Sequence, residues 1–140
     1  MNYLDYAATT PVNAEVLEVI TKEMASFGNP SSVYRIGREQ KQKIERVKKA
    51  ILSELQASPH DAIIFTSSGS EGNNLVFESI REHFAKEKGH IIVSAVEHPS
   101  VRKSAEFLEQ EGFEVTYLAP NKEGIVTVSE IEQALREDTR

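Results

Sequence analysis

Cysteine is absent from the 140 residues of this chain. Disulfides, thiolate metal sites and a thiol nucleophile are therefore excluded within it. No apolar run approaches the roughly 20 residues that a membrane-spanning helix needs. The first residues, MNYLDYAATTP, include an acidic residue and have neither the basic n-region nor the apolar h-region of a signal peptide. We therefore expect a cytoplasmic protein with no membrane partner.

The chain also lacks an excess of positive charge and lacks histidines at the spacing of metal ligands. The formal net charge is −6 at pH 7, and the densest basic cluster, from Arg35 to Lys49, lies on a predicted helix with glutamates interleaved. Such a cluster is typical of a solvated helix face, so we expect no nucleic-acid partner. The four histidines are not spaced as metal-ligand pairs, and we expect no metal.

The two familiar glycine-rich phosphate loops, GxGxxG and GxxxxGK[ST], do not occur. Another candidate anion site lies in residues 62–77, AIIFTSSGSEGNNLVF, a pattern that predicts a strand, a tight turn and a helix. Unpaired N–H groups at a helix start attract anions, and Gly69 and Ser70 stand at this start. Ser70, with Glu71 and Asn73 after it, also fits an ordinary helix N-cap. Both interpretations stay open at this point.

Hydrophobic periodicity predicts alternating helices and strands along most of the chain. Two helices come first, the earlier one capped by Asn13, and then three strands are each followed by a helix. The predicted helices cover residues 13–24, 38–57, 70–87, 101–112 and 129–135, and the predicted strands cover residues 62–66, 90–96 and 113–118. Three strand–helix repeats in a chain the size of one domain indicate right-handed crossovers. We therefore expect an α/β fold with a mostly parallel sheet and flanking helices.

His98 directly follows the second predicted strand and precedes Pro99. Ligands of parallel sheets bind beyond the carboxyl ends of the strands, and the turns at 67–70 and 97–100 both lie at such ends. We therefore expect these turns at one rim of the sheet. An imidazole there can stack on a flat heteroaromatic ligand or transfer a proton near neutral pH. A partly exposed loop histidine with no further role is the alternative.

Four segments of the chain form a set of sequence motifs. They begin at Tyr3 (YLDYAATTP), Phe27 (FGNPSSVYRIGRE), Phe65 (FTSSGSEGNN) and Val96 (VEHPSV). In this order they resemble the successive signatures of cysteine desulfurases, a group of class-V aminotransferase-like pyridoxal-phosphate enzymes. The resemblance covers almost the whole chain.

The resemblance implies a partial fold of the pyridoxal-phosphate-dependent transferases. Residues 1–12 would form an extended N-terminal arm, and residues 13–140 the first half of the aspartate-aminotransferase-like large domain. Pyridoxal 5'-phosphate would be the cofactor, with its phosphate at Gly69 and Ser70 and its ring against His98, the candidate catalytic residue. L-cysteine would be the substrate, and alanine and an enzyme persulfide would be the products.

The family's Schiff-base lysine and nucleophilic cysteine lie downstream of the matched region, so we expect this chain alone to be inactive. We also expect a homodimer and a sulfur-acceptor protein, serving iron–sulfur cluster assembly or tRNA thiolation. Two further interpretations stay open: another class-V enzyme, such as a selenocysteine lyase or an aminotransferase, and a non-catalytic fragment that needs a separate second half. Ser68 stands where the family pattern usually has glycine, which narrows the backbone angles available to the turn.

Overall fold

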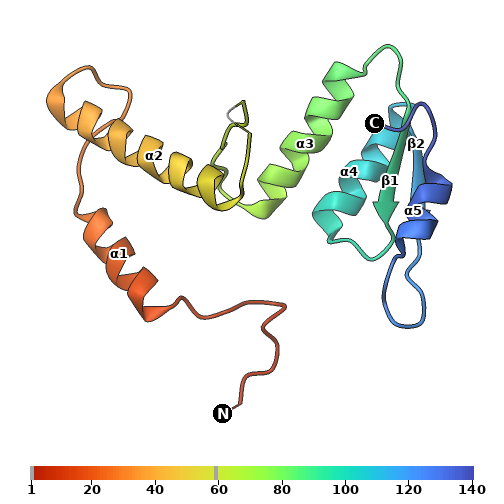
Figure 1. Ribbon diagram of the computed structural model, residues 1–140, viewed down its shortest axis with the longest axis horizontal. Coiled ribbons are helices and arrows are strands. Elements are labelled where there is room, and N and C mark those ends of the chain that lie inside the picture. The colour runs from red at the N-terminus through yellow and green to blue at the C-terminus, as the bar shows by residue number, and fades with distance from the viewer. Residues whose placement is uncertain (1, 59) are drawn as a thin grey trace. The chain divides into compact units, whose positions relative to one another are not determined.

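A computed structural model describes residues 2–58 and 60–140 of the chain (Figure 1). The chain divides into two compact units, an N-terminal unit (Met1–Ile64) and a C-terminal unit (Phe65–Arg140). In the part of the chain that the structure describes, the N-terminal unit carries two helices. The C-terminal unit carries three helices and two strands. Within the described residues, no helix is both long enough and apolar enough to cross a lipid bilayer.

The N-terminal unit contains α1 (Ala14–Met24) and α2 (Arg35–Glu54). Helix α1 begins where the sequence predicts, because the Asn13 side chain accepts a hydrogen bond from the N–H of Glu15. The end of α1 is tied to α2 by Lys43, whose Nζ lies 2.7 Å from a Glu23 carboxylate oxygen and 2.8 Å from the Ser26 hydroxyl. Helix α2 begins and ends three residues before its predicted bounds. At its end, Gln56 turns the chain with a φ of 50°.

The loop from Phe27 to Ser32 follows a fixed path over the first turn of α2. Gly37 is the one buried residue of α2, and a Cβ built on it would lie 2.5 Å from the carbonyl oxygen of Ser32 and 2.6 Å from that of Asn29. Any side chain at Gly37 would therefore collide with loop backbone. The glycine at this position permits the close approach of the loop to the helix.

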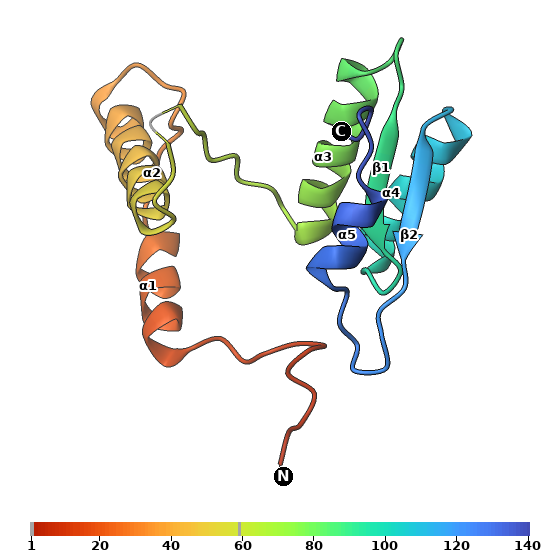
Figure 2. The same ribbon diagram turned by 45° about the vertical axis from the view of Figure 1, so that its right-hand side comes forward.

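The C-terminal unit is built as a helix–strand–helix–strand–helix series. Its elements are α3 (Gly69–His83), β1 (His90–Ser94), α4 (Pro99–Gln110), β2 (Glu114–Leu118) and α5 (Val128–Ala134). The two strands pair in parallel, with His90 opposite Glu114 and Ser94 opposite Leu118. Helix α4 packs along both strands and against α3, and α5 contacts β2 (Figure 2). This is the α/β arrangement, with a parallel sheet and flanking helices, that the periodicity predicts.

The core of the C-terminal unit lies between the sheet and the helices. Its buried members come from β1, from α4 and from the start of the β2 segment, and aromatic and aliphatic side chains of α3 pack against them. The buried residues are Ile91, Val93, Ala105, Leu108 and Phe113. Helices α3 and α4 are therefore held by apolar burial on the same small sheet, and this fixes how their first turns lie relative to each other.

The predicted strand at 62–66 is not a strand in the structure. These residues make no ladder pairing, and Ile64 and Phe65 are 70% and 56% exposed. A strand is stabilised by a hydrogen-bonded neighbour, and the sheet in the described part of the chain has only two members, β1 and β2. Local propensity alone does not supply such a neighbour. The prediction is wrong for this reason.

The boundaries of the other elements differ from the predictions by a few residues. Helix α3 ends at His83 and not near Glu87. Strand β1 ends at Ser94, two residues early, and α4 begins at Pro99, two residues before Val101. Helix α5 begins at Val128, because the Thr127 hydroxyl accepts from the N–H of Glu130 and caps the helix.

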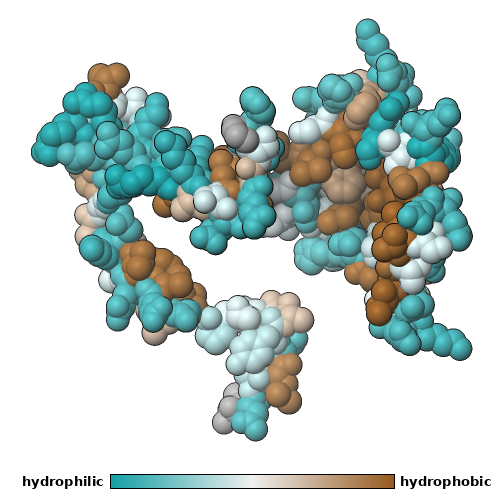
Figure 3. All heavy atoms as spheres, in the orientation of Figure 1, coloured by the Kyte–Doolittle hydropathy of each residue, from teal (hydrophilic) through white to brown (hydrophobic). Residues whose placement is uncertain are grey.

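Several helices expose apolar side chains. Helix α1 has no buried residue, and Figure 3 shows hydrophobic side chains at its surface. On its apolar stripe, Val16, Leu17, Ile20 and Met24 are 50%, 54%, 44% and 81% exposed. Exposed apolar area of this extent marks a surface that other protein groups can cover.

Candidate functional site

The turn before α3 is closed by three hydrogen bonds among Ser67, Ser68 and Glu71. The Ser68 hydroxyl accepts from the N–H of Glu71 at 3.2 Å, which makes Ser68 the N-cap. In return, one Glu71 carboxylate oxygen accepts from the N–H and from the hydroxyl of Ser67, both at 2.6 Å. The interpretation of Ser70 as the N-cap is therefore wrong, because Ser68 holds that role.

Ser68 also fits the turn without strain. Its φ of −162° and ψ of 163° are extended backbone angles that any residue adopts. Serine in place of the family's glycine therefore introduces no backbone strain in the turn. The Ser68 side chain also supplies the hydroxyl that caps the helix. Since the Ser67 N–H and the Glu71 N–H already have acceptors, the donors that remain at the helix start include the N–H groups of Gly69 and Ser70.

Gly69 and Ser70 are the first two residues of α3, and both are exposed. Within residues 2–58 and 60–140, neither backbone N–H has an acceptor and the Ser70 hydroxyl makes no hydrogen bond. A Cβ built on Gly69 would meet no atom within 4 Å. The start of α3 thus offers two amides and a hydroxyl beside open space, at the positive end of the helix dipole.

The Glu71 carboxylate sits next to these donors. Hydrogen bonds from the Ser67 hydroxyl, and then from the Ser67 N–H, lower the pKa of Glu71 below its ordinary value of 4.5. The carboxylate therefore stays ionised at neutral pH and remains engaged with Ser67. It leaves the amides of Gly69 and Ser70 to other acceptors.

His98 is the N-cap of α4, and its ring is exposed. Its Nδ1 accepts from the N–H of Ser100 at 3.2 Å and lies 2.9 Å from the Ser100 hydroxyl oxygen. Pro99 occupies the first turn of the helix, where its missing N–H costs no hydrogen bond. The ring is therefore held through Nδ1, and Nε2 has no hydrogen-bond partner among the residues that the structure describes.

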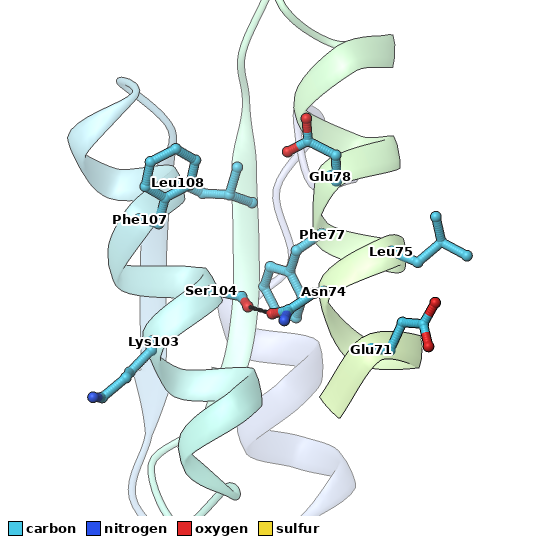
Figure 4. A pocket seen from close by; sticks show the side chains of 9 residues that line it. All are labelled: Glu71, Asn74, Leu75, Phe77, Glu78, Lys103, Ser104, Phe107 and Leu108. Atoms are coloured by element: carbon cyan, nitrogen blue, oxygen red, sulfur yellow. Dashed lines mark hydrogen bonds between the residues drawn. The ribbon is translucent and has the colours of Figure 1, made fainter. Parts of the chain in front are cut away.

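The structure joins the first turn of α3 to the turn that carries His98. The Asn73 side-chain N–H donates to the Ser100 hydroxyl at 2.9 Å, and that hydroxyl contacts His98 Nδ1. One turn further along α4, the Ser104 hydroxyl donates to Oδ1 of Asn74, the residue after Asn73, at 2.7 Å, as Figure 4 shows. Hydrogen bonds between side chains thus tie the two polar turns together within one unit.

Sequence reasoning assigns Asn73 only to helix capping and gives Ser100 no role. The sequence His-Pro-Ser does carry a usable signal, since an N-cap side chain accepts from the N–H two or three residues later. No comparable signal exists for the contact between Asn73 and Ser100. It joins residues 27 positions apart and depends on how α3 packs against α4.

A groove between α3 and α4 continues from this end of the helices (Figure 4). Apolar side chains from both helices line it, with Glu71 and Glu78 on α3 and Lys103 on α4. Gly69, Ser70 and His98 do not line the groove, so the candidate anion site and the groove are separate features. Within the described residues, no cluster of three His, Cys, Asp or Glu side chains could hold a metal ion.

The residues of the two turns fit a phosphorylated, flat heteroaromatic cofactor. The free donors of Gly69 and Ser70 suit a phosphate, and the open space at the Gly69 Cα admits its close approach. The His98 ring, restrained at Nδ1, can lie against an aromatic face. Pyridoxal 5'-phosphate combines both chemical features.

Comparisons with known proteins agree with these features. The family model described as aminotransferase class-V matches residues 2–140. Cysteine desulfurase IscS of Dictyoglomus turgidum is 44% identical over 138 residues, which are 98% of this chain and 35% of that protein. IscS of Pectobacterium carotovorum is 40% identical over 141 residues, with the same shares covered. The chain thus spans about a third of the length of these relatives.

Solved structures give the same result for the fold. SspA in complex with cysteine matches with a TM-score of 0.88 and 38% identity, over 99% of this chain and 40% of that one. A NifS-like protein matches with a TM-score of 0.85 and 34% identity, over 96% and 37% of the two chains. These comparisons confirm the predicted resemblance and the partial fold of pyridoxal-phosphate-dependent transferases. The chain belongs to the class-V aminotransferase family, whose enzymes depend on pyridoxal phosphate.

Proposed function

We propose that this chain is the N-terminal part of a pyridoxal-phosphate-dependent cysteine desulfurase. The enzyme would remove sulfur from L-cysteine and leave alanine and an enzyme-bound persulfide for transfer. The observation that carries the proposal is the hydrogen-bonded link from Asn73 through Ser100 to His98. It joins a helix start with free donors to a restrained imidazole. The identity to IscS proteins and the likeness to SspA in complex with cysteine support the substrate.

In this proposal Gly69 and Ser70 hold the cofactor phosphate. Their amides and the Ser70 hydroxyl supply three donors, and the dipole of α3 adds a favourable field. His98 lies against the cofactor ring, and its Nε2 is the nitrogen left to face the reacting groups. Bound pyridoxal phosphate supplies an electron sink for the bonds at the substrate α-carbon. The chain's own residues bind and orient the cofactor.

The proposal also assigns the parts of the active site to different parts of the protein. Residues 1–12 would be an extended arm, and residues 13–140 would be the first half of the cofactor-binding domain. The cysteine that receives sulfur would come from outside these residues, since the chain has no cysteine. The lysine that holds the cofactor would come from outside them too, because the resemblance to the family places it downstream of the matched region. A cytoplasmic homodimer that passes sulfur to an acceptor protein, for iron–sulfur assembly or tRNA thiolation, completes the proposal.

Cofactor binding by this chain is testable by NMR with pyridoxamine 5'-phosphate, which has no aldehyde to react with surface lysines. We expect the amide signals of Gly69 and Ser70 and the ring signals of His98 to shift on titration. Pyridoxamine without phosphate should leave the two amides unmoved. Ser70→Ala should weaken binding about fivefold through loss of one hydrogen bond. Ser79→Ala is the matched control, since the Ser79 hydroxyl donates to the Leu75 carbonyl oxygen of the same helix, away from the helix start.

The catalytic part of the proposal has its own test. The chain mixed with pyridoxal phosphate and L-cysteine should release no sulfide, because it lacks the thiol that receives the sulfur. Sulfide release by this chain would contradict the proposal that the cysteine needed for the reaction lies outside these residues. Amide shifts spread over the surface and absent from Gly69 and Ser70 would contradict the phosphate site.

A further inference from the structure

The hydrogen bonds at Nδ1 of His98 determine where the ring carries its proton. The Ser100 N–H donates to Nδ1 at 3.2 Å. A backbone N–H can only donate, so Nδ1 must present a lone pair. The proton of the neutral ring is therefore on Nε2.

The Ser100 hydroxyl reinforces this state. Its oxygen lies 2.9 Å from Nδ1 and 2.9 Å from the Asn73 side-chain nitrogen. The Asn73 N–H occupies one lone pair of that oxygen, and Nδ1 presents its own lone pair to the Ser100 N–H. The hydroxyl proton is therefore the group that faces Nδ1. Asn73, Ser100 and His98 thus form a chain of donors that all point the same way. Asn73 and Ser100 are both half-buried, which limits competition from water.

We propose that Asn73 and Ser100 are positioning residues that hold His98 as the Nε2–H tautomer. The neutral ring then offers a hydrogen-bond donor at Nε2 and no proton acceptor there. The meaning for catalysis rests on the proposed function: His98 would act on the reacting groups as a stacking partner and donor. To accept a proton at Nε2, the ring would first have to move its own proton to Nδ1. It would then lose the hydrogen bond from the Ser100 N–H, and the contact with the Ser100 hydroxyl would have to reverse its direction.

The tautomer can be measured without cofactor or substrate, so its failure is distinguishable from failure of the proposed function. The chain is labelled with ¹⁵N-histidine and studied by NMR at about pH 9, where an ordinary imidazole is neutral. His98→Gln identifies the His98 signals by their loss. Each hydrogen bond accepted by Nδ1 contributes about a fivefold preference. We therefore expect the Nε2–H form to exceed the Nδ1–H form more than about tenfold.

Two substitutions test the positioning residues. Ser100→Ala removes the hydroxyl donor and keeps the backbone donor, so the preference should fall about fivefold. Asn73→Asp replaces a donor by an acceptor, which turns the Ser100 hydroxyl away from Nδ1, so the preference should fall at least as far. Ser100→Thr retains the hydroxyl and should retain the preference.

The matched control is Asn74→Asp. It adds the same charge one residue away and keeps an acceptor oxygen for the Ser104 hydroxyl, so the His98 signals should stay as they are. A dominant Nδ1–H form, or an even mixture, in the unmodified chain would overturn the assignment of the tautomer. An unchanged ratio in both Ser100→Ala and Asn73→Asp would overturn the role of these residues, with unaltered helical circular dichroism showing that the fold is intact.

Discussion

Nε2 of His90 lies 2.7 Å from the hydroxyl oxygen of Thr116, which joins β1 to β2 through side chains as well as through the backbone. The other ring nitrogen lies 2.9 Å from the Thr139 hydroxyl oxygen. His90 is only 1% exposed, and its backbone also bonds the segment near the C-terminus, at Asp138 and Arg140. One buried imidazole thus connects three segments of the C-terminal unit.

His90→Ala should lower the free energy of unfolding by about 3 kcal/mol, because it removes two buried hydrogen bonds and leaves a cavity. Urea unfolding followed by far-ultraviolet circular dichroism measures this. His83→Ala is the control: His83 is an exposed residue in the last turn of α3, and its loss should cost less than about 0.5 kcal/mol. Equal effects of the two substitutions would contradict a structural role for His90.

The sequence is sufficient to predict the elements that carry a strong apolar pattern. The helices lie within a few residues of their predicted bounds. The strands that begin near His90 and Phe113 are also present. The first of them is predicted from a nearly continuous apolar run, which is typical of a strand that is covered on both faces. The strand at 62–66 fails, since a strand needs a neighbour that local sequence does not specify. The cap at Ser68 and the contact between Asn73 and Ser100 depend on backbone angles and helix packing, which periodicity does not contain.

Substitution of glycine by alanine should have opposite effects on stability at Gly37, which is crowded, and at Gly69, which faces open space. Gly37→Ala should lower the free energy of unfolding by about 1–3 kcal/mol, because its Cβ would lie within 2.6 Å of two loop carbonyl oxygens. Gly69→Ala should raise it by up to about 1 kcal/mol, since its Cβ meets nothing and alanine restricts the unfolded chain. Thermal unfolding of the two variants measures both effects. A tolerated Gly37→Ala would show that the loop can move away from α2.

The pKa of the Glu71 carboxyl group should depend on its hydrogen bonds with Ser67. Hydrogen bonding lowers the pKa of Glu71 in the folded chain below the ordinary 4.5. The contacts therefore stabilise the turn above pH 4.5 and are lost as the pH falls through the lowered pKa. Ser67→Ala removes the larger of the two causes and should raise the pKa of Glu71 toward its ordinary value. Carboxyl ¹³C NMR measures the titration, with Ser79→Ala as control, and an unmoved midpoint in Ser67→Ala would be inconsistent with this prediction.

The apolar stripe of α1 should make the isolated chain self-associate. Val16, Leu17, Ile20 and Met24 lie on one stripe of a helix that buries none of its residues. Sedimentation velocity over a range of concentrations should show species heavier than the 15.7 kDa monomer. Leu17→Glu places a charge within the stripe and should shift the distribution toward the monomer, because the charge would have to be desolvated in any contact. Val33→Glu, at an 85% exposed position outside α1, is the matched control and should change little. A chain that sediments only as a monomer at every concentration would show that the stripe does not drive association.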